Sequence, residues 1–167
     1  MSAAVGAIST RLVGPDAAWI VLDVMRRCWA GTVASDSTAY LETRQVVAAQ
    51  LERGGGALAF SGDTPIGGGR FLPVPGPPRD PRHWVEIKRV GVLRAYRKAG
   101  LGAELVHVLE GEARRRGYAG AQLGVRADQP RLVSFWSRLG YLEAVDVVLH
   151  TENPLTPKPT HMRKLFA

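Results

Sequence analysis

The sequence predicts a single α/β domain in which one mixed, mostly antiparallel, seven-stranded sheet is flanked by about four helices. The chain has 167 residues, a length that fits one domain spanning residues 1–167. Hydrophobic residues make up 46% of it, enough for one core and too many for an intrinsically disordered chain. One helical segment separates two strand-like segments, which implies at least one parallel strand pair among the hairpins.

The first third of the chain predicts one strand and two helices. Residues 5–13 form an apolar strand that a Gly-Pro pair ends. Apolar residues then recur at helical spacing over residues 17–28, with charged residues on the other side. We expect a second helix to begin at Ser35 or Asp36, whose side-chain oxygens can cap it, and to end at a run of three glycines.

The middle of the chain predicts a hairpin followed by a loop. Residues 57–61 and 66–72 are two strands joined by a turn-rich spacer. Residues 73–82 hold five of the eleven prolines, so they predict an exposed loop. Inside the second strand, residues 67–69 are three glycines, which indicate a bulge, the close approach of a ligand, or only local irregularity.

The second half of the chain alternates strands with helices. A helical pattern begins after a strand-like segment and ends at three arginines and a glycine. Cations in the last turn stabilise the negative end of the helix dipole, and glycine commonly ends a helix. The expected strands are residues 84–92, 119–126, 145–150 and 161–166, and the expected helices are residues 101–116 and 130–139.

The charge balance predicts an anionic ligand. Twenty-two Lys and Arg against fifteen Asp and Glu give a net charge of +7, with a pI near 10.2. Such a balance attracts nucleic acid or a phosphorylated cofactor, and charge alone does not choose between them. Since the basic residues are scattered and no nucleic-acid motif is present, we expect no nucleic-acid partner.

Cysteine, histidine and hydropathy patterns exclude other classes. Cys28 is the only cysteine, so no internal disulfide or cysteine-based zinc cluster forms, and we expect a buried thiol on the first helix. The four histidines lack the spacing of metal ligands, so no metal is expected. No apolar run approaches the ~20 residues that span a bilayer, and the start lacks a signal-peptide pattern. We therefore expect a cytoplasmic protein with no membrane partner.

The segment VGVLRAYRKAGLGA, residues 90–103, carries the most chemical information. A strand runs into a glycine-bearing turn that opens a helix. Free N–H groups at a helix start, the positive end of its dipole and close backbone approach at glycine favour a bound diphosphate. The segment is neither a P-loop nor a dinucleotide fingerprint, since it lacks Gly-Lys-Ser/Thr and a third glycine. A structural glycine turn is the alternative.

Two motifs in this order resemble the GNAT family of N-acetyltransferases. Residues 97–102, RKAGLG, resemble the R/Q-x-x-G-x-G/A acetyl-CoA loop of that family. Residues 134–141, SFWSRLGY, resemble the F-Y-x-x-x-G-F end of its next helix, and residues 86–96 are similar to its fourth strand. The similarity is clear over residues 84–141, whereas residues 1–56 match only in pattern.

This resemblance implies a GNAT fold whose fourth and fifth strands splay apart to admit the pantetheine arm of acetyl-CoA. It implies transfer of an acetyl group to a primary amine of a small molecule or peptide. Backbone groups on the fourth strand would bind pantetheine, amides of the loop would bind the diphosphate, and Gln129 would stand where the family has asparagine. The implied cofactor-binding residues are Val90, Gly91, Val92, Arg97, Lys98, Ala99, Gly100, Leu101, Gly102, Ala103, Gln129 and Trp136. The implied acceptor-binding residues are Trp29, Asp36 and Tyr40.

Glu86 is the candidate general base. An amine acceptor with a pKa of ~10.4 is about one-thousandth neutral at pH 7, so a proton must be removed at a cost of about 4 kcal/mol. Charges within a central apolar strand need partners or a function. Glu86 stands six residues before Val92, the spacing at which several relatives keep a basic carboxylate. The alternatives are an ion pair with Lys88 or a solvated edge.

Trp136 departs from the family pattern. It aligns with the tyrosine that protonates the departing thiolate, and an indole N–H is not a useful acid at neutral pH. Another hydroxyl from Ser134, Ser137 or Tyr141, a water molecule or bulk solvent would have to replace it. A catalytically degenerate acyl-CoA-binding sensor is therefore the alternative function. The resemblance leaves both a monomer and a homodimer open.

Overall fold

The computed structural model describes residues 6–30, 38–97, 100–150 and 154–167. They form one mixed sheet of seven strands in the order β1-β2-β3-β4-β5-β7-β6. Neighbouring strands are antiparallel except β4 and β5, which are parallel. The fold class predicted from the sequence is thus confirmed. The strands are β1 (Ile8–Val13), β2 (Gly55–Ser61), β3 (Thr64–Pro75), β4 (His83–Val92), β5 (Gly120–Val125), β6 (Leu142–Glu143) and β7 (Thr160–Leu165).

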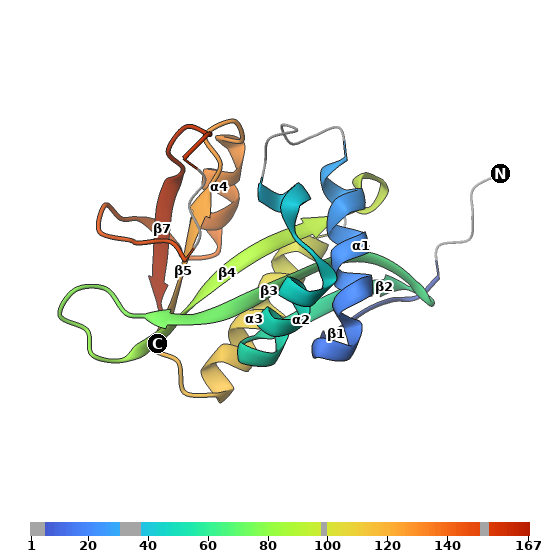
Figure 1. Cartoon of the computed structure of the whole chain (residues 1–167), viewed down its shortest axis with the longest axis horizontal. Helices are drawn as coiled ribbons and strands as arrows, with labels where there is room; N and C mark the ends of the chain where they lie inside the picture. The colour runs from blue at the N-terminus through green and yellow to red at the C-terminus, as the bar shows by residue number, and fades with distance from the viewer. Residues whose placement is uncertain (1–5, 31–37, 98–99, 151–153) are drawn as a thin grey trace.

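Helices cover both faces of the sheet (Figure 1). The period-two alternation of β2 divides the core between them, because successive side chains point to opposite faces. Leu58 and Phe60 pack with α1 and α2, whereas Ala57 and Ala59 pack in the larger core that includes α3. The α-helices are α1 (Ala18–Trp29), α2 (Arg44–Arg53), α3 (Leu101–Arg115) and α4 (Arg131–Arg138). Short 3₁₀ helices are η1 (Pro15–Ala17), η2 (Thr38–Leu41) and η3 (Arg94–Tyr96).

The second helix begins later than the sequence indicated. We expected its start at Ser35 or Asp36, but α2 begins at Arg44, where the Thr43 hydroxyl accepts a hydrogen bond from the backbone N–H of Val46. A capping threonine satisfies an orphan N–H as well as the earlier residues would. The short helix η2 precedes α2, and Ser35 and Asp36 lie outside the described residues.

Two strand boundaries also differ from expectation. The strand predicted at residues 145–150 is wrong: only Leu142–Glu143 pair with β7, and Val145 is 99% exposed. Of the three valines in this segment only Val147 is buried, and Val148 is 82% exposed, so the segment follows an irregular path instead of pairing with β7. Conversely, β3 continues through Pro73 and Pro75, which we expected in a loop. That end of β3 lies past the last β2 pair, so a proline without an N–H leaves no ladder bond unmade.

The three glycines of β3 mark close packing and a bulge. A Cβ added at Gly67 would lie 2.9 Å from the Gly91 carbonyl oxygen, and one at Gly69 would lie 2.9 Å from Val90 Cγ2. Opposite them, register shifts between Gly68 and Arg70, because β4 inserts an extra residue there. The structure thus supports the prediction of a bulge at these glycines. The atoms that approach them closely belong to β4 and to side chains of the protein.

Candidate active site

The parallel pair opens into a wedge. β4 and β5 pair only at Val85 with Ala121 and at Glu86 with Gln122, and beyond these positions they separate (Figure 1). A cavity of about 700 Å³ lies in this opening, between α1 on one side and α3 and α4 on the other. Its described lining includes most of the residues that the sequence singled out for the cofactor, namely Val90, Gly91, Val92, Arg97, Gly100, Gly102, Ala103, Gln129 and Trp136.

Glu86 lies at the closed end of this wedge. Its side chain is 3% exposed, yet the residue lines the cavity. Its Oε1 accepts two hydrogen bonds of 2.9 Å, one from Gln122 Nε2 and one from the backbone N–H of His150. Among the described residues, no ion pair joins Glu86 to Lys88. The structure therefore does not support the alternative in which Glu86 is one half of a structural ion pair. Two neutral donors orient one oxygen of a carboxylate at the cavity wall.

The start of α3 supplies an anion-binding turn. Gly100 adopts φ +73°, the left-handed region that favours glycine, and no described side chain caps the helix. The N–H groups of the first turn therefore remain available to a ligand. Leu101 is 2% exposed, so its side chain anchors the turn in the core instead of lining the cavity. Lys98 and Ala99 lie outside the described residues.

Arg97 connects this turn to α1. Its Nε donates to the Val92 carbonyl oxygen at 2.9 Å, and its Nη2 donates to the Cys28 carbonyl oxygen at 2.8 Å. These bonds tie the end of β4 to the end of α1 across the mouth of the cavity. The guanidinium thus keeps its charge beside the turn while it satisfies two backbone acceptors.

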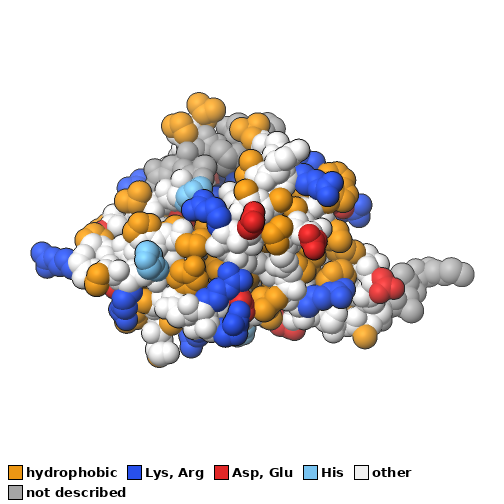
Figure 2. All heavy atoms as spheres, turned by 60° about the horizontal axis from the view of Figure 1, so that its bottom comes forward, with side chains coloured by type: hydrophobic (Ala, Val, Ile, Leu, Met, Phe, Trp, Pro, Cys, Tyr) orange, Lys and Arg blue, Asp and Glu red, His pale blue; other side chains and the backbone are white. Residues whose placement is uncertain are grey.

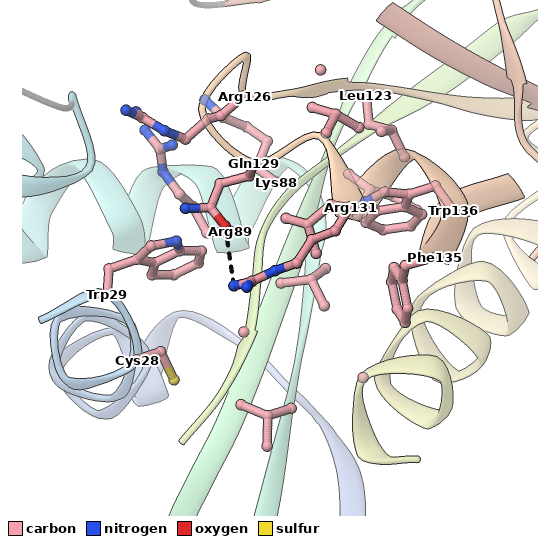
Figure 3. Close-up of a pocket in the computed structure, with 18 of the residues that line it drawn as sticks. Cys28, Trp29, Lys88, Arg89, Leu123, Arg126, Gln129, Arg131, Phe135 and Trp136 are labelled. Carbon is pink, nitrogen blue, oxygen red and sulfur yellow. Dashed lines mark hydrogen bonds between the residues drawn. The ribbon is translucent and has the colours of Figure 1, made fainter. Parts of the chain in front are cut away.

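Of the three predicted acceptor residues, Trp29 lies on the α1 side of the cavity. Trp29 lines it, and Figure 3 shows its indole opposite Gln129 and Arg131. Tyr40 is absent from the described lining, but its hydroxyl donates to the Trp29 carbonyl oxygen at 2.8 Å. Tyr40 therefore ties η2 to the C-terminal end of α1, where Trp29 lies. Asp36, the third candidate, lies outside the described residues.

A buried charge cluster that the sequence did not reveal supports the same wall. Glu42 Oε1 accepts from Arg70 Nη2 at 2.5 Å and from Arg89 Nε at 3.2 Å, and Arg70 also donates to Gln50 at 2.7 Å. Burial raises the pKa of Glu42, but the two guanidinium groups outweigh it and hold that pKa below its usual range. Arg89 adopts φ +56°, an uncommon conformation for a residue with a side chain.

Apart from Arg131 at its start, α4 presents apolar and aromatic side chains to the cavity. Phe135 and Trp136 make an edge-to-face contact with ring centroids 5.2 Å apart, and Trp136 makes another with Tyr141 at 5.1 Å. Tyr141 is fully buried and its hydroxyl bonds to Glu110 at 3.2 Å. Burial, followed by the nearby Glu110 carboxylate, raises the pKa of Tyr141. Tyr141 lies outside the described cavity lining, so it is poorly placed as a general acid.

Cys28 lines the cavity but is a poor nucleophile. Burial raises the pKa of its thiol to about 11, with a smaller opposing effect from Arg97. A neutral thiol does not attack a thioester efficiently. Among the described residues, no group of three or more His, Cys, Asp or Glu is placed to hold a metal ion. Within the same residues, no helix is long and apolar enough to cross a bilayer.

Comparison with known proteins assigns the family. Residues 19–141 match the model of the acetyltransferase (GNAT) family, and the chain belongs to that family. Comparison with curated proteins finds no match. Among solved structures, an acetyltransferase of the GNAT family from Staphylococcus aureus superposes with a TM-score of 0.73 at 13% identity, covering 95% of this chain and 99% of its own.

Two further structures share the fold. The PaiA N-acetyltransferase from Thermoplasma acidophilum, in complex with coenzyme A, has a TM-score of 0.72 at 15% identity, covering 96% of this chain and 99% of that one. A putative acyl-CoA N-acyltransferase from Klebsiella pneumoniae has a TM-score of 0.64 at 21% identity, covering 95% and 97%. At these identities the likeness establishes a shared architecture.

Proposed function

We propose that this protein is an acetyl-CoA-dependent N-acetyltransferase that acetylates a primary amine by direct transfer in a ternary complex. The observation that carries the proposal is the wedge itself. It connects the uncapped start of α3 with the buried carboxylate of Glu86 in one cavity. The Thermoplasma relative, whose structure contains coenzyme A, has the same fold and supports the proposal.

The described residues fit acetyl-CoA. N–H groups at the start of α3 bind the diphosphate, and Gly100 leaves open space, since nothing lies within 4 Å of a Cβ added there. Backbone groups of Val90, Gly91 and Val92, beyond the last β4–β5 pair, are available to the pantetheine amides. Acetyl-CoA supplies the thioester carbonyl that the amine attacks.

Glu86 accepts the proton of the incoming ammonium, directly or through one water molecule. The bond between the amine nitrogen and the carbonyl carbon forms as the bond between that carbon and sulfur breaks. The hydrogen bonds from Gln122 and His150 fix the carboxylate during this transfer. As the amide forms, the nitrogen loses its second proton to water. Because Trp136 offers no acidic proton, the coenzyme A thiolate leaves and takes its proton from solvent.

One observation favours a second candidate function. Trp136 lines the cavity at the position where the family pattern has a tyrosine, as a degenerate acyl-CoA-binding sensor would allow. Release of free coenzyme A thiol separates the two. We expect an amine-dependent rate of thiol release with a panel of primary amines. Binding of acetyl-CoA without amine-dependent release would favour the sensor, and no measurable affinity for coenzyme A would exclude both.

The face of the molecule drawn in Figure 2 has no continuous basic surface of the kind that binds nucleic acid. Figure 2 shows Lys and Arg side chains dispersed among acidic and hydrophobic ones there, without a continuous basic stripe. Proteins that follow a phosphate backbone usually present such a stripe. We therefore propose that the anionic partners of this protein are small ligands.

A further inference from the structure

Positive side chains outnumber negative ones among the described residues that line the cavity. Among the described lining residues, Glu86 is the only carboxylate, and it lies at the closed end. Because the proposed acceptor is itself a cation before it loses its proton, lining cations that the cofactor phosphates do not neutralise would repel it unless another part of the acceptor is negative. The cationic lining residues are Lys88, Arg89, Arg97, Arg126 and Arg131.

Three of these cations are already engaged. Arg97 bonds to two backbone carbonyls, Arg89 pairs with Glu42, and Arg126 pairs with Asp128 at 3.0 Å. Their positions follow from structural partners, so they do not by themselves require a ligand.

Lys88 and Arg131 differ from the other three. Among the described residues, neither has a carboxylate within ion-pair distance, and Arg131 Nη2 donates only to the neutral Gln129 Oε1, at 3.3 Å. Burial, and then the neighbouring Arg89, lower the pKa of Lys88, while Glu86 opposes this without reversing it. Lys88 and Arg131 are thus the two lining cations that no described carboxylate pairs with.

The fold places these charges where an acceptor must lie. Lys88 follows Glu86 by two residues on β4, so the two share a face of the strand at the point where β5 departs. Val92, next to the diphosphate turn, is four residues after Lys88, but the bulge absorbs one of them, so the two lie about 10 Å apart along the strand. Figure 3 shows Lys88, Arg89 and Arg126 on the Trp29 side of the cavity, Arg131 reaching towards them, and Leu123, Phe135 and Trp136 on the other side.

We propose that the acceptor is an amine that also carries an anionic group, a carboxylate or a phosphate, and that Lys88 with Arg131 binds that group. This inference rests on the proposed acetyltransferase function and names its substrate class. The anion neutralises the two cations that lack a carboxylate partner, and the amine then faces Glu86. Polyamines and lysine-rich peptides meet repulsion in the same cavity.

The test uses matched pairs of acceptors with the full-length protein. Each pair differs only in the anionic group: glycine with glycinamide, and phosphoethanolamine with ethanolamine. The measured quantity is the ratio of kcat/KM for the anionic member to that for its partner, in wild type and in Lys88→Gln. Comparing the ratio between proteins cancels differences in the intrinsic reactivity of the amines. The two pairs also distinguish a carboxylate from a phosphate acceptor.

We expect the ratio to favour one anionic member at least tenfold in wild type and to fall at least tenfold in Lys88→Gln, through KM for the acceptor. The charge-reversing Lys88→Glu should favour the partner that lacks the anionic group. Arg138→Gln, which removes an exposed cation from α4 outside the described lining, is the matched control and should keep the wild-type ratio. The dependence of kcat/KM on ionic strength is a further test that needs no variant. We expect kcat/KM to fall with added salt only for the acceptor that carries the anionic group.

Different failures have different meanings. Equal or better turnover of amines that lack an anionic group, polyamines included, would overturn the inference and leave the acetyltransferase intact. A rise in KM for acetyl-CoA instead of the acceptor in Lys88→Gln would assign these cations to coenzyme A phosphates and also overturn it. Binding of coenzyme A without turnover of any amine would reject the proposed function, and this inference with it.

Discussion

Gln122 donates a 2.9 Å hydrogen bond to Oε1 of Glu86, its register partner at the last pair of the parallel strands β4 and β5. The same point of the sheet therefore both ends the ladder and orients the carboxylate. Beyond it the unpaired strand edges line the cavity. The separation of β4 from β5, which makes room for a ligand, and the placement of the candidate base therefore both depend on the Glu86–Gln122 pair.

Glu86→Gln should lower kcat by ~10² to 10⁴. The amide oxygen of glutamine still accepts hydrogen bonds from Gln122 and the His150 N–H, so the fold and the affinity for acetyl-CoA should persist. Steady-state kinetics across pH, together with calorimetric titration of coenzyme A, measure both effects. Glu143→Gln, an exposed change on β6, is the control for loss of a carboxylate. An unaltered pH–rate profile in Glu86→Gln would remove this residue from proton transfer.

Gly102→Val should weaken the binding of acetyl-CoA by more than tenfold. A Cβ at position 102 already lies 3.4 Å from the Phe135 ring, so the two further methyl groups of valine crowd the cavity beside the first turn of α3. Calorimetric titration measures the affinity, and a thermal melt shows that the variant folds. Gly111→Ala, in open space on the same helix, should leave affinity unchanged and stabilise the protein by about 1 kcal/mol. An unchanged affinity in Gly102→Val would remove the turn from the cofactor site.

The sequence predicted local features of this site better than distant contacts. The glycine turn and α3 followed from adjacent residues, and Glu86 and Trp29 do line one cavity. The cluster around Glu42 was missed because its partners Arg70 and Arg89 are 28 and 47 residues away, and no local periodicity records such a pairing. Arg126 and Arg131 were also missed, although they flank Gln129. Their place in the sequence could have identified them, because they lie between the end of β5, where the strands separate, and the start of α4.

Glu42→Gln should destabilise the fold by about 3–5 kcal/mol, because it leaves the buried guanidinium of Arg70 without its counter-charge. Urea unfolding monitored by tryptophan fluorescence measures the change. Glu52→Gln removes an exposed carboxylate from α2 and should stay within about 0.5 kcal/mol of wild type. A loss no larger in Glu42→Gln than in this control would show that Arg70 is solvated by other means.

The Glu42 cluster also predicts how stability depends on pH. The folded protein holds the pKa of Glu42 below its ordinary value of 4.5, so the unfolded state binds the proton more readily. The contribution of Glu42 is therefore complete above about pH 4.5 and is lost as the pH falls through the folded pKa. Unfolding free energies between pH 7 and pH 3 should decline less steeply in Glu42→Gln than in wild type. Parallel curves would mean that other carboxylates dominate acid unfolding.

Cys28 should react slowly with iodoacetamide at pH 7. A thiol pKa raised by burial to about 11, against 9.0 for an ordinary thiol, reduces the thiolate to about one-hundredth of its usual amount, since each unit is a factor of ten. We expect alkylation at least tenfold slower than in urea-unfolded protein, with a rate that keeps rising above pH 9. Coenzyme A should slow it further, because Cys28 lines the cavity that the ligand fills. Mass spectrometry of timed samples gives these rates. Labelling as fast in the folded as in the unfolded protein would mean an exposed, ionised sulfur, and it would reopen a covalent acyl-enzyme route that competes with direct transfer to the amine.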